Sequence, residues 1–200
     1  MGRNYRSLDG IDRSLRVRER VQIGGGFNLD NQANDLTGWS TRGLFDDNQT
    51  GDLGSFDAAG DPVFSTTRIG GIMLPHAVSL ERLGMVFDQS ADNTGVTGWG
   101  WVLSWHTPII GSSSYASTVV LNERKTGVSA GLDAAWAGTD GDLREYDGNN
   151  HRADIGLSGL PDNVVPAGSI INLAVGQIGT GSSNARYVYV HAGFLEVAPV

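Results

Sequence analysis

The sequence contains no cysteine, which excludes a disulfide scaffold, a thiol nucleophile and a thiolate metal site. It also lacks an apolar run of the roughly 18–20 residues that a membrane-spanning helix needs. Lysine is almost absent, because 13 of the 14 basic residues are arginines. Proline occurs 6 times in 200 residues, whereas glycine occurs 29 times, about twice its ordinary frequency of ~7%. With 40% hydrophobic residues the chain can bury a core, so we expect a soluble globular domain.

A helical pattern is missing as well. No segment repeats apolar residues at the 3.6-residue spacing of an amphipathic helix over three turns. Short runs of alternating apolar residues occur instead, separated by Gly, Asn, Asp and Ser, and the clearest cover residues 99–105, 128–134 and 187–194. A phase slip near Arg82 indicates a β-bulge. The pattern predicts an all-β fold, a jelly-roll-like antiparallel β-sandwich over residues 63–200. We expect no catalytic residue, metal or cofactor.

Charge is distributed unevenly along the chain. Residues 1–20 carry six arginines and three acidic residues, a balance of +3, whereas the other 180 residues carry 8 basic and 19 acidic side chains, a balance of −11. A basic arm on an acidic body indicates an interaction segment. We expect an extended arm over residues 1–26, ending at Gly24–Gly26, which would act as a swivel.

The arm contains a strand-like segment at residues 15–23, in which arginines alternate with apolar residues. Such a segment can add to an exposed sheet edge of a partner protein, or it can be an ordinary edge strand of its own domain. Three phosphate contacts on a chain of net charge −8 are too few for nucleic acid, so we expect a protein partner. The candidate partner-binding residues are Arg3, Arg6, Arg13, Arg16, Arg18, Arg20, Val17 and Val21.

Residues 27–62 are predicted to be a long irregular segment, because Asp, Asn and Gly dominate them. Isolated apolar residues along it predict an ordered loop that packs on a surface, either that of the chain's own domain or that of a partner protein. These residues are Trp39, Leu44, Phe45, Leu53 and Phe56.

Three tryptophans, Trp99, Trp101 and Trp105, share one face of a predicted strand with Leu103. A row of aromatic rings can stack on sugars, and a stripe that includes a leucine is also typical of a hydrophobic core. The core interpretation is favoured here. The sugar-stacking interpretation supports the alternative function, a carbohydrate-binding sandwich such as a tail-fibre or receptor-binding domain.

Other motifs that carry chemistry have simpler explanations. Gly127–Gly131 has the G-x-S-x-G spelling of a nucleophile elbow around Ser129, but it lies in a strand pattern without the helix that the elbow requires. The four histidines are scattered without metal-ligand spacing. Acidic clusters at 46–52 and 140–147 offer oxygen ligands for calcium, although Asp and Asn also favour turns by themselves.

Three segments carry a resemblance to known families. Val164–Ser169, which precedes a predicted strand, and the closing Tyr187–Val197 resemble tumour-necrosis-factor-like and complement-type jelly rolls. Met73–Leu80 is similar to the early strand of phage head-fibre and decoration domains. With the basic arm, the whole resembles the decoration (cement) proteins of tailed phages, although residues 27–62 depart from that pattern.

This resemblance implies a non-enzymatic protein of the virion surface, made in the host cytoplasm. Such proteins are usually trimers that bind the major capsid protein through an extended terminal arm. It implies neither a nucleic-acid partner nor a membrane partner.

Overall fold

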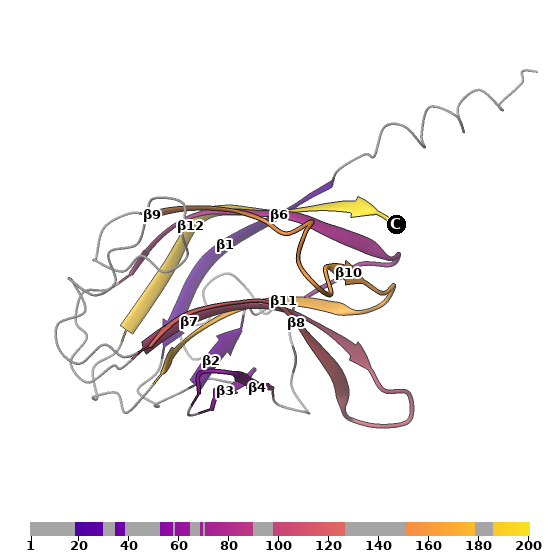
Figure 1. Cartoon of the computed structure of the whole chain (residues 1–200), viewed down its shortest axis with the longest axis horizontal. Coiled ribbons are helices and arrows are strands. Elements are labelled where there is room, and N and C mark those ends of the chain that lie inside the picture. The colour runs from indigo at the N-terminus through magenta and orange to yellow at the C-terminus, as the bar shows by residue number, and fades with distance from the viewer. Residues whose placement is uncertain are drawn as a thin grey trace, which may run out of the picture.

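The computed structural model describes residues 19–29, 35–38, 53–57, 59–64, 69, 71–89, 98–126, 151–178 and 186–200. Within these residues the chain forms twelve β-strands (Figure 1). They are β1 (Glu19–Leu29), β2 (Asp35–Gly38), β3 (Gly54–Phe56), β4 (Pro62–Phe64), β5 (Ile72–Met73), β6 (Val78–Gln89), β7 (Gly98–Pro108), β8 (Tyr115–Thr126), β9 (His151–Gly156), β10 (Val164–Val165), β11 (Ile170–Ile178) and β12 (Arg186–Pro199). None of the described residues forms a helix that could cross a membrane.

The strands form two antiparallel sheets. Sheet A has the order β1-β12-β6-β10, with β9 also paired to β6, and sheet B has the order β4-β3-β2-β11-β7-β8, with β5 paired to β11. The two sheets lie face to face as the layers of a sandwich (Figure 1).

The strand pairing defines a jelly roll. Eight strands, taken in chain order, are β1, β2, β6, β7, β8, β9, β11 and β12. The first pairs with the eighth, the second with the seventh, the third with the sixth and the fourth with the fifth. The links β12–β6 and β11–β7 join these pairs into the two sheets. This is the eight-stranded, double Greek-key arrangement, so the predicted fold class is confirmed.

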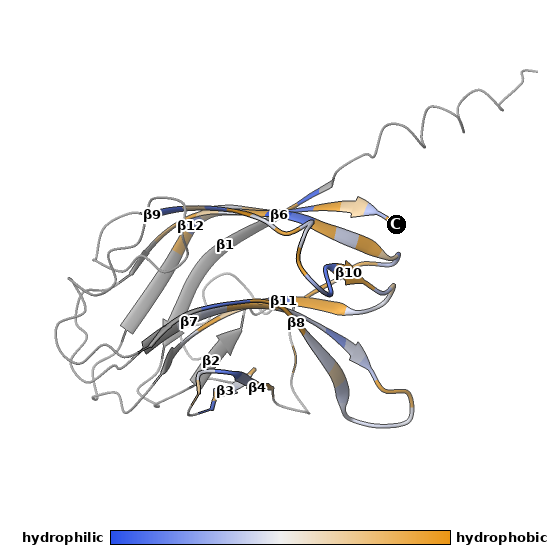
Figure 2. Ribbon diagram, viewed as in Figure 1, coloured by the Kyte–Doolittle hydropathy of each residue, from blue (hydrophilic) through white to orange (hydrophobic). Residues whose placement is uncertain are grey.

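The main core lies between the sheets and is formed by apolar residues of β1 and of β6 to β12. Figure 2 shows apolar residues along the strands of both layers. Phe87 from sheet A and Trp101 from sheet B are both 0% exposed, and their rings pack edge to face at 5.5 Å. The bulge expected near Arg82 is present: Arg82 pairs with Glu196, whereas Leu80 pairs with the very next residue, Val197. The extra residue, Glu81, explains the change of phase along β6.

Strand β1 belongs to the chain's own sheet. It pairs with β12 along its length and continues through Gly24–Gly26, with a register shift between Ile23 and Gly25. Of the two interpretations of this segment, residues 19–29 follow that of an edge strand of the chain's own domain. The predicted alternation holds where side chains are described, because Val21 packs on the core and Arg20 is exposed. Residues 1–18 lie outside the described residues, so the arm remains a prediction.

The segment expected to be irregular, 27–62, contributes several short strands, with turns and bends between them, among its described residues. It supplies the end of β1, all of β2 and β3, and the start of β4. Strands β2, β3 and β4 are too short for an alternating sequence pattern, and sheet B provides their hydrogen-bond partners. Leu53 and Phe56 are buried against Val102 and Ala174 in a second core on the outer side of sheet B. At these two apolar residues the segment therefore packs on the chain's own domain.

Candidate functional site

The predicted tryptophan row is part of the interior where its side chains are described. Trp101 is 0% exposed, and Trp105 packs partly buried against the same core and donates its Nε1–H to the Asp162 carbonyl at 3.0 Å. A sugar in solvent cannot reach Trp101. The side chain of Trp99 lies outside the described residues.

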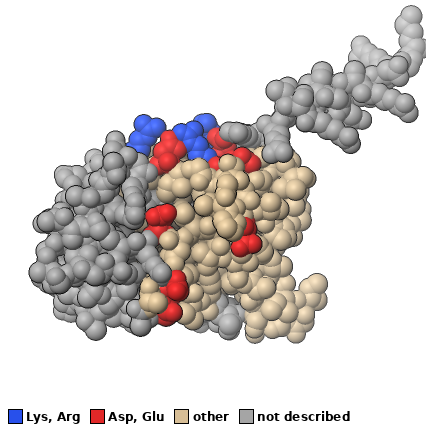
Figure 3. Space-filling model, in the orientation of Figure 1, with Lys and Arg blue, Asp and Glu red and all other residues tan. Residues whose placement is uncertain are grey.

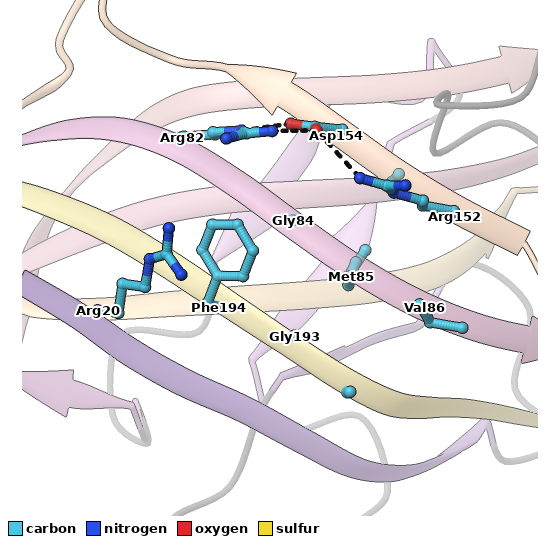
Figure 4. Close-up of a pocket in the computed structure, with 11 residues that line it drawn as sticks. Arg20, Arg82, Gly84, Met85, Val86, Arg152, Asp154, Gly193 and Phe194 are labelled. Carbon is cyan, nitrogen blue, oxygen red and sulfur yellow. Dashed lines mark hydrogen bonds and ion pairs between the residues drawn. The ribbon is translucent and has the colours of Figure 1, made fainter.

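A different aromatic ring is placed on the surface. Phe194, in the middle of β12, lies across from Gly84 of β6 on the outer face of sheet A (Figure 4). A Cβ atom at position 84 would be 2.6 Å from two ring carbons of Phe194, so only glycine lets the ring rest flat on the neighbouring strand. The ring is half-buried, so part of it is open to solvent.

Two guanidinium groups flank this ring. Arg20 from β1 lies with its Cζ 4.8 Å from the ring centroid, and Arg82 from β6 lies at 5.9 Å. Both distances are within the range of a cation–π contact. Glu196, only 4% exposed, pairs with the Arg20 Nε at 3.4 Å and holds that side chain beside the ring.

Arg82 is fixed by a second partner on β9. Its Nε and Nη2 donate to the two carboxylate oxygens of Asp154, a bidentate pair with a defined plane. This hydrogen bonding holds the pKa of Asp154 below its ordinary value, so the carboxylate stays charged at neutral pH. Arg152 lies 3.8 Å from the same carboxylate and has a side chain that is 71% exposed.

Together these residues line a shallow pocket of about 380 Å³, here called the Phe194 pocket. Its lining residues are Arg20, Arg82, Gly84, Met85, Val86, Arg152, Ala153, Asp154, Ala192, Gly193 and Phe194. Basic and acidic side chains gather over sheet A on the upper surface in Figure 3. The pocket combines a flat apolar floor with fixed hydrogen-bond donors and acceptors, which is the chemistry of a ligand site.

A buried polar cluster lies on the opposite sheet. His106 is 0% exposed, and its Nε2 and Nδ1 share hydrogen bonds with Ser104 Oγ at 2.9 Å and Ser117 Oγ at 2.8 Å. Phe64 of β4 packs edge-on against the imidazole at 4.8 Å. Burial lowers the pKa of His106 to about 4, so the ring is neutral at pH 7. A substrate cannot reach either His106 or Ser104, and the cluster therefore has a structural role.

One end of the sandwich exposes apolar side chains, here called the apolar rim. They are Met73 (65% exposed), Ile109 (47%), Ile110 (101%), Val164 (47%) and Val200 (76%). The segments that carry them are close: Thr107 bonds Ser169, Gly168 bonds Leu74, and Val200 bonds Ala77. Figure 1 shows β10, the C-terminus and the β7–β8 hairpin at this end.

The remaining predicted residues are distributed as follows. Arg20 and Val21 are on β1, whereas Arg3, Arg6, Arg13, Arg16, Val17 and Arg18 lie outside the described residues, as do Ser129 and the acidic clusters. Among the described residues, no group of three or more His, Cys, Asp or Glu side chains could hold a metal ion.

No sequence pattern marks the Phe194 pocket. Phe194 belongs to an alternating strand pattern, and Gly84 carries no signal of its own. Three strands, β1, β6 and β9, each contribute one arginine to the pocket: Arg20, Arg82 and Arg152. Only the strand pairing shows that these strands and β12 are neighbours.

No protein-family model and no curated protein matches the chain. Among solved structures, the chain is similar to one from infectious bursal virus-derived T=1 particles. The identity is 11% and the TM-score 0.31, over 92% of this chain and 32% of that one, so this chain spans about a third of its length. A similarity of this size carries no argument about function, and the strand pairing itself defines the fold.

Proposed function

We propose that the chain is a non-enzymatic structural protein of a virion, which decorates and stabilises a phage capsid. In this proposal the N-terminal arm and the β body dock onto major capsid subunits, and three copies associate on the capsid surface. The observation that carries it is the apolar rim, where Ile110 is fully exposed at the tip of a hairpin. Exposed apolar side chains gathered at one end of a domain are typical of protein–protein contacts.

Strand β1 adds support, because it leads directly from the basic arm into sheet A. Among the described residues β1 pairs only with β12, so its other edge presents backbone groups that a further strand can pair with. Jelly rolls serve in viral capsid proteins and also in lectins, so the fold by itself allows both classes.

Cosedimentation with capsids assembled from the major capsid protein of the same genome tests the proposal. We expect the full chain to pellet with the capsids and to raise their melting temperature. A variant with Arg3, Arg6, Arg13, Arg16 and Arg18 changed to Gln should bind at least about tenfold more weakly, because it loses the charged contacts of the arm.

A control variant carries Arg124→Gln and Lys125→Gln on β8 of sheet B and should bind as the unchanged chain does. If the unchanged chain pellets equally with and without capsids, the decoration role is wrong. If the arm variant binds as well as the control, the arm has no part in docking.

A further inference from the structure

We propose that the Phe194 pocket binds an acidic saccharide, with one sugar ring stacked on Phe194 and its carboxylate paired with Arg20 or Arg152. This site differs from the tryptophan row that the sequence suggested, and it does not depend on the capsid role.

The ring offers the surface that a pyranose requires. The C–H face of a sugar packs on the flat face of an aromatic side chain, and Phe194 lies flat because Gly84 leaves room beneath it. Val86, 38% exposed, and the exposed Ala192 continue the apolar floor beside the ring. The pocket of about 380 Å³ lies within the range of small-ligand sites.

The polar groups around the ring suit hydroxyl groups and one carboxylate. Asp154 and Arg82 hold each other in a fixed plane, which presents an acceptor and a donor side by side for a pair of sugar hydroxyls. Arg20 and Arg152 have side chains 59% and 71% exposed, so their guanidinium groups are accessible to a ligand carboxylate.

The balance of charge favours a ligand that places a single carboxylate in the pocket. Three guanidinium groups and the carboxylates of Asp154 and Glu196 leave a net charge of +1 (3 − 2) at the pocket. A uronic acid carries one negative charge and many hydroxyls, which matches this balance. A phosphate dianion carries two negative charges, so the Asp154 carboxylate repels it more strongly than it repels a single ligand carboxylate.

The position in the sheet argues against a peptide. Phe194 is on β12, whose two edges are already paired with β1 and β6. A peptide chain therefore finds no backbone groups here for strand addition, the common way in which a sheet recognises a peptide. A ligand at this site must be held by side chains alone.

Calorimetric titration of the full chain with tri-galacturonic acid tests the inference, with maltotriose, inorganic phosphate and a tri-glutamate peptide as comparison ligands. We expect tri-galacturonate to bind at least about tenfold more tightly than each comparison ligand, a difference of about 1.4 kcal/mol. Phe194→Ala should lower the affinity for tri-galacturonate at least about tenfold. Phe194→Tyr keeps the aromatic ring and should bind tri-galacturonate as tightly as the unchanged chain does.

The sharpest comparison uses two glycines of the same sheet. Gly84→Ala pushes the Phe194 ring off the strand and should weaken binding as Phe194→Ala does, whereas a Cβ at Gly156 meets nothing within 4 Å. Gly156→Ala should therefore bind normally, and circular dichroism shows whether each variant is folded.

Three outcomes overturn the inference. The first is no binding of tri-galacturonate by the unchanged chain at millimolar concentration. The second is an affinity for phosphate or tri-glutamate equal to that for tri-galacturonate, which would mean that the site recognises negative charge alone. The third is normal binding by a folded Gly84→Ala variant. None of these results bears on capsid docking, so the two proposals fail independently.

Discussion

At the scale of single residues, the structure depends on a few side chains whose neighbours give them their properties. His106 looks like any strand histidine in the sequence, and burial between two serines and Phe64 makes it a neutral core residue. Gly84 looks like one of 29 glycines, and its missing Cβ is what allows Phe194 to lie on the sheet.

His106 should make the fold sensitive to acid. Its pKa is about 4 in the folded chain and about 6.5 when unfolded, so the unfolded state binds the proton first as the pH falls. The stability that the neutral ring contributes is complete above pH 6.5 and is lost as the pH falls toward 4. The loss between pH 7 and about pH 4.5 is roughly 2.5 kcal/mol.

Urea unfolding of the unchanged chain and of His106→Gln, at pH 7 and at about pH 4.5, measures this effect. The variant has no imidazole to protonate, so the difference in free energy of unfolding between the two proteins should shrink on acidification. Comparing the two proteins cancels the titration of their common carboxylates. A difference that stays constant with pH would contradict the prediction.

At the scale of elements, the hairpin β3–β4 has a covering role. It extends sheet B beyond β2, and its side chains Phe56 and Phe64 close the outer side of that sheet over Val102 and Ala174. The bulge at Glu81 has a comparable local effect on β6, because it returns Arg82 to the outer face opposite Glu196. Short strands of this kind are decided by neighbouring strands rather than by their own sequence.

Phe64→Ala should uncover His106. Removing the ring that packs at 4.8 Å admits water to the imidazole, so the pKa of His106 should rise from about 4 toward its ordinary value. An NMR titration of the histidine ring protons measures this shift. Val63→Ala is the matched control, because Val63 lies on the same strand and is 55% exposed. A Phe64→Ala variant whose His106 titrates as in the unchanged chain would show that β4 does not shield the imidazole.

At the scale of the whole molecule, the jelly roll presents two different surfaces. The outer face of sheet A carries fixed charges around an aromatic ring, and the apolar rim lies at one end of the sandwich. The first has the chemistry of a small-ligand site, and the second has that of a contact between proteins. One domain can therefore serve both proposed roles at once.

Ile110→Asp should change assembly without changing the fold. Ile110 is 101% exposed, so the substitution should alter the free energy of unfolding by no more than about 0.5 kcal/mol. If the rim holds copies together, light scattering after size exclusion should give a trimer for the unchanged chain and a smaller species for the variant. Val63→Asp, on the edge strand β4, is the control and should leave the mass unchanged. A monomeric unchanged chain would remove the trimer from the proposal.

The sequence by itself determined the class of fold. Alternating apolar residues between glycine-rich turns are visible along the chain, and they require strands with one buried face, as in the stripe of Trp101 and Leu103. The phase slip at Arg82 also located a bulge, because an extra residue reverses the alternation wherever it occurs. The alternation of Arg20 and Val21 gave the two faces of β1 in the same way.

Only the tertiary structure decided which surfaces these strands make. The pairing of β1 with β12, and of β6 with β9, brings Arg20, Phe194, Gly84 and Asp154 together from positions up to 174 residues apart (194 − 20). No local pattern encodes such a contact, because each residue obeys only the period-2 rule of its own strand. The register between strands is a property of the folded sheet, and it places Phe194 on the outer face of sheet A and Trp101 in the core.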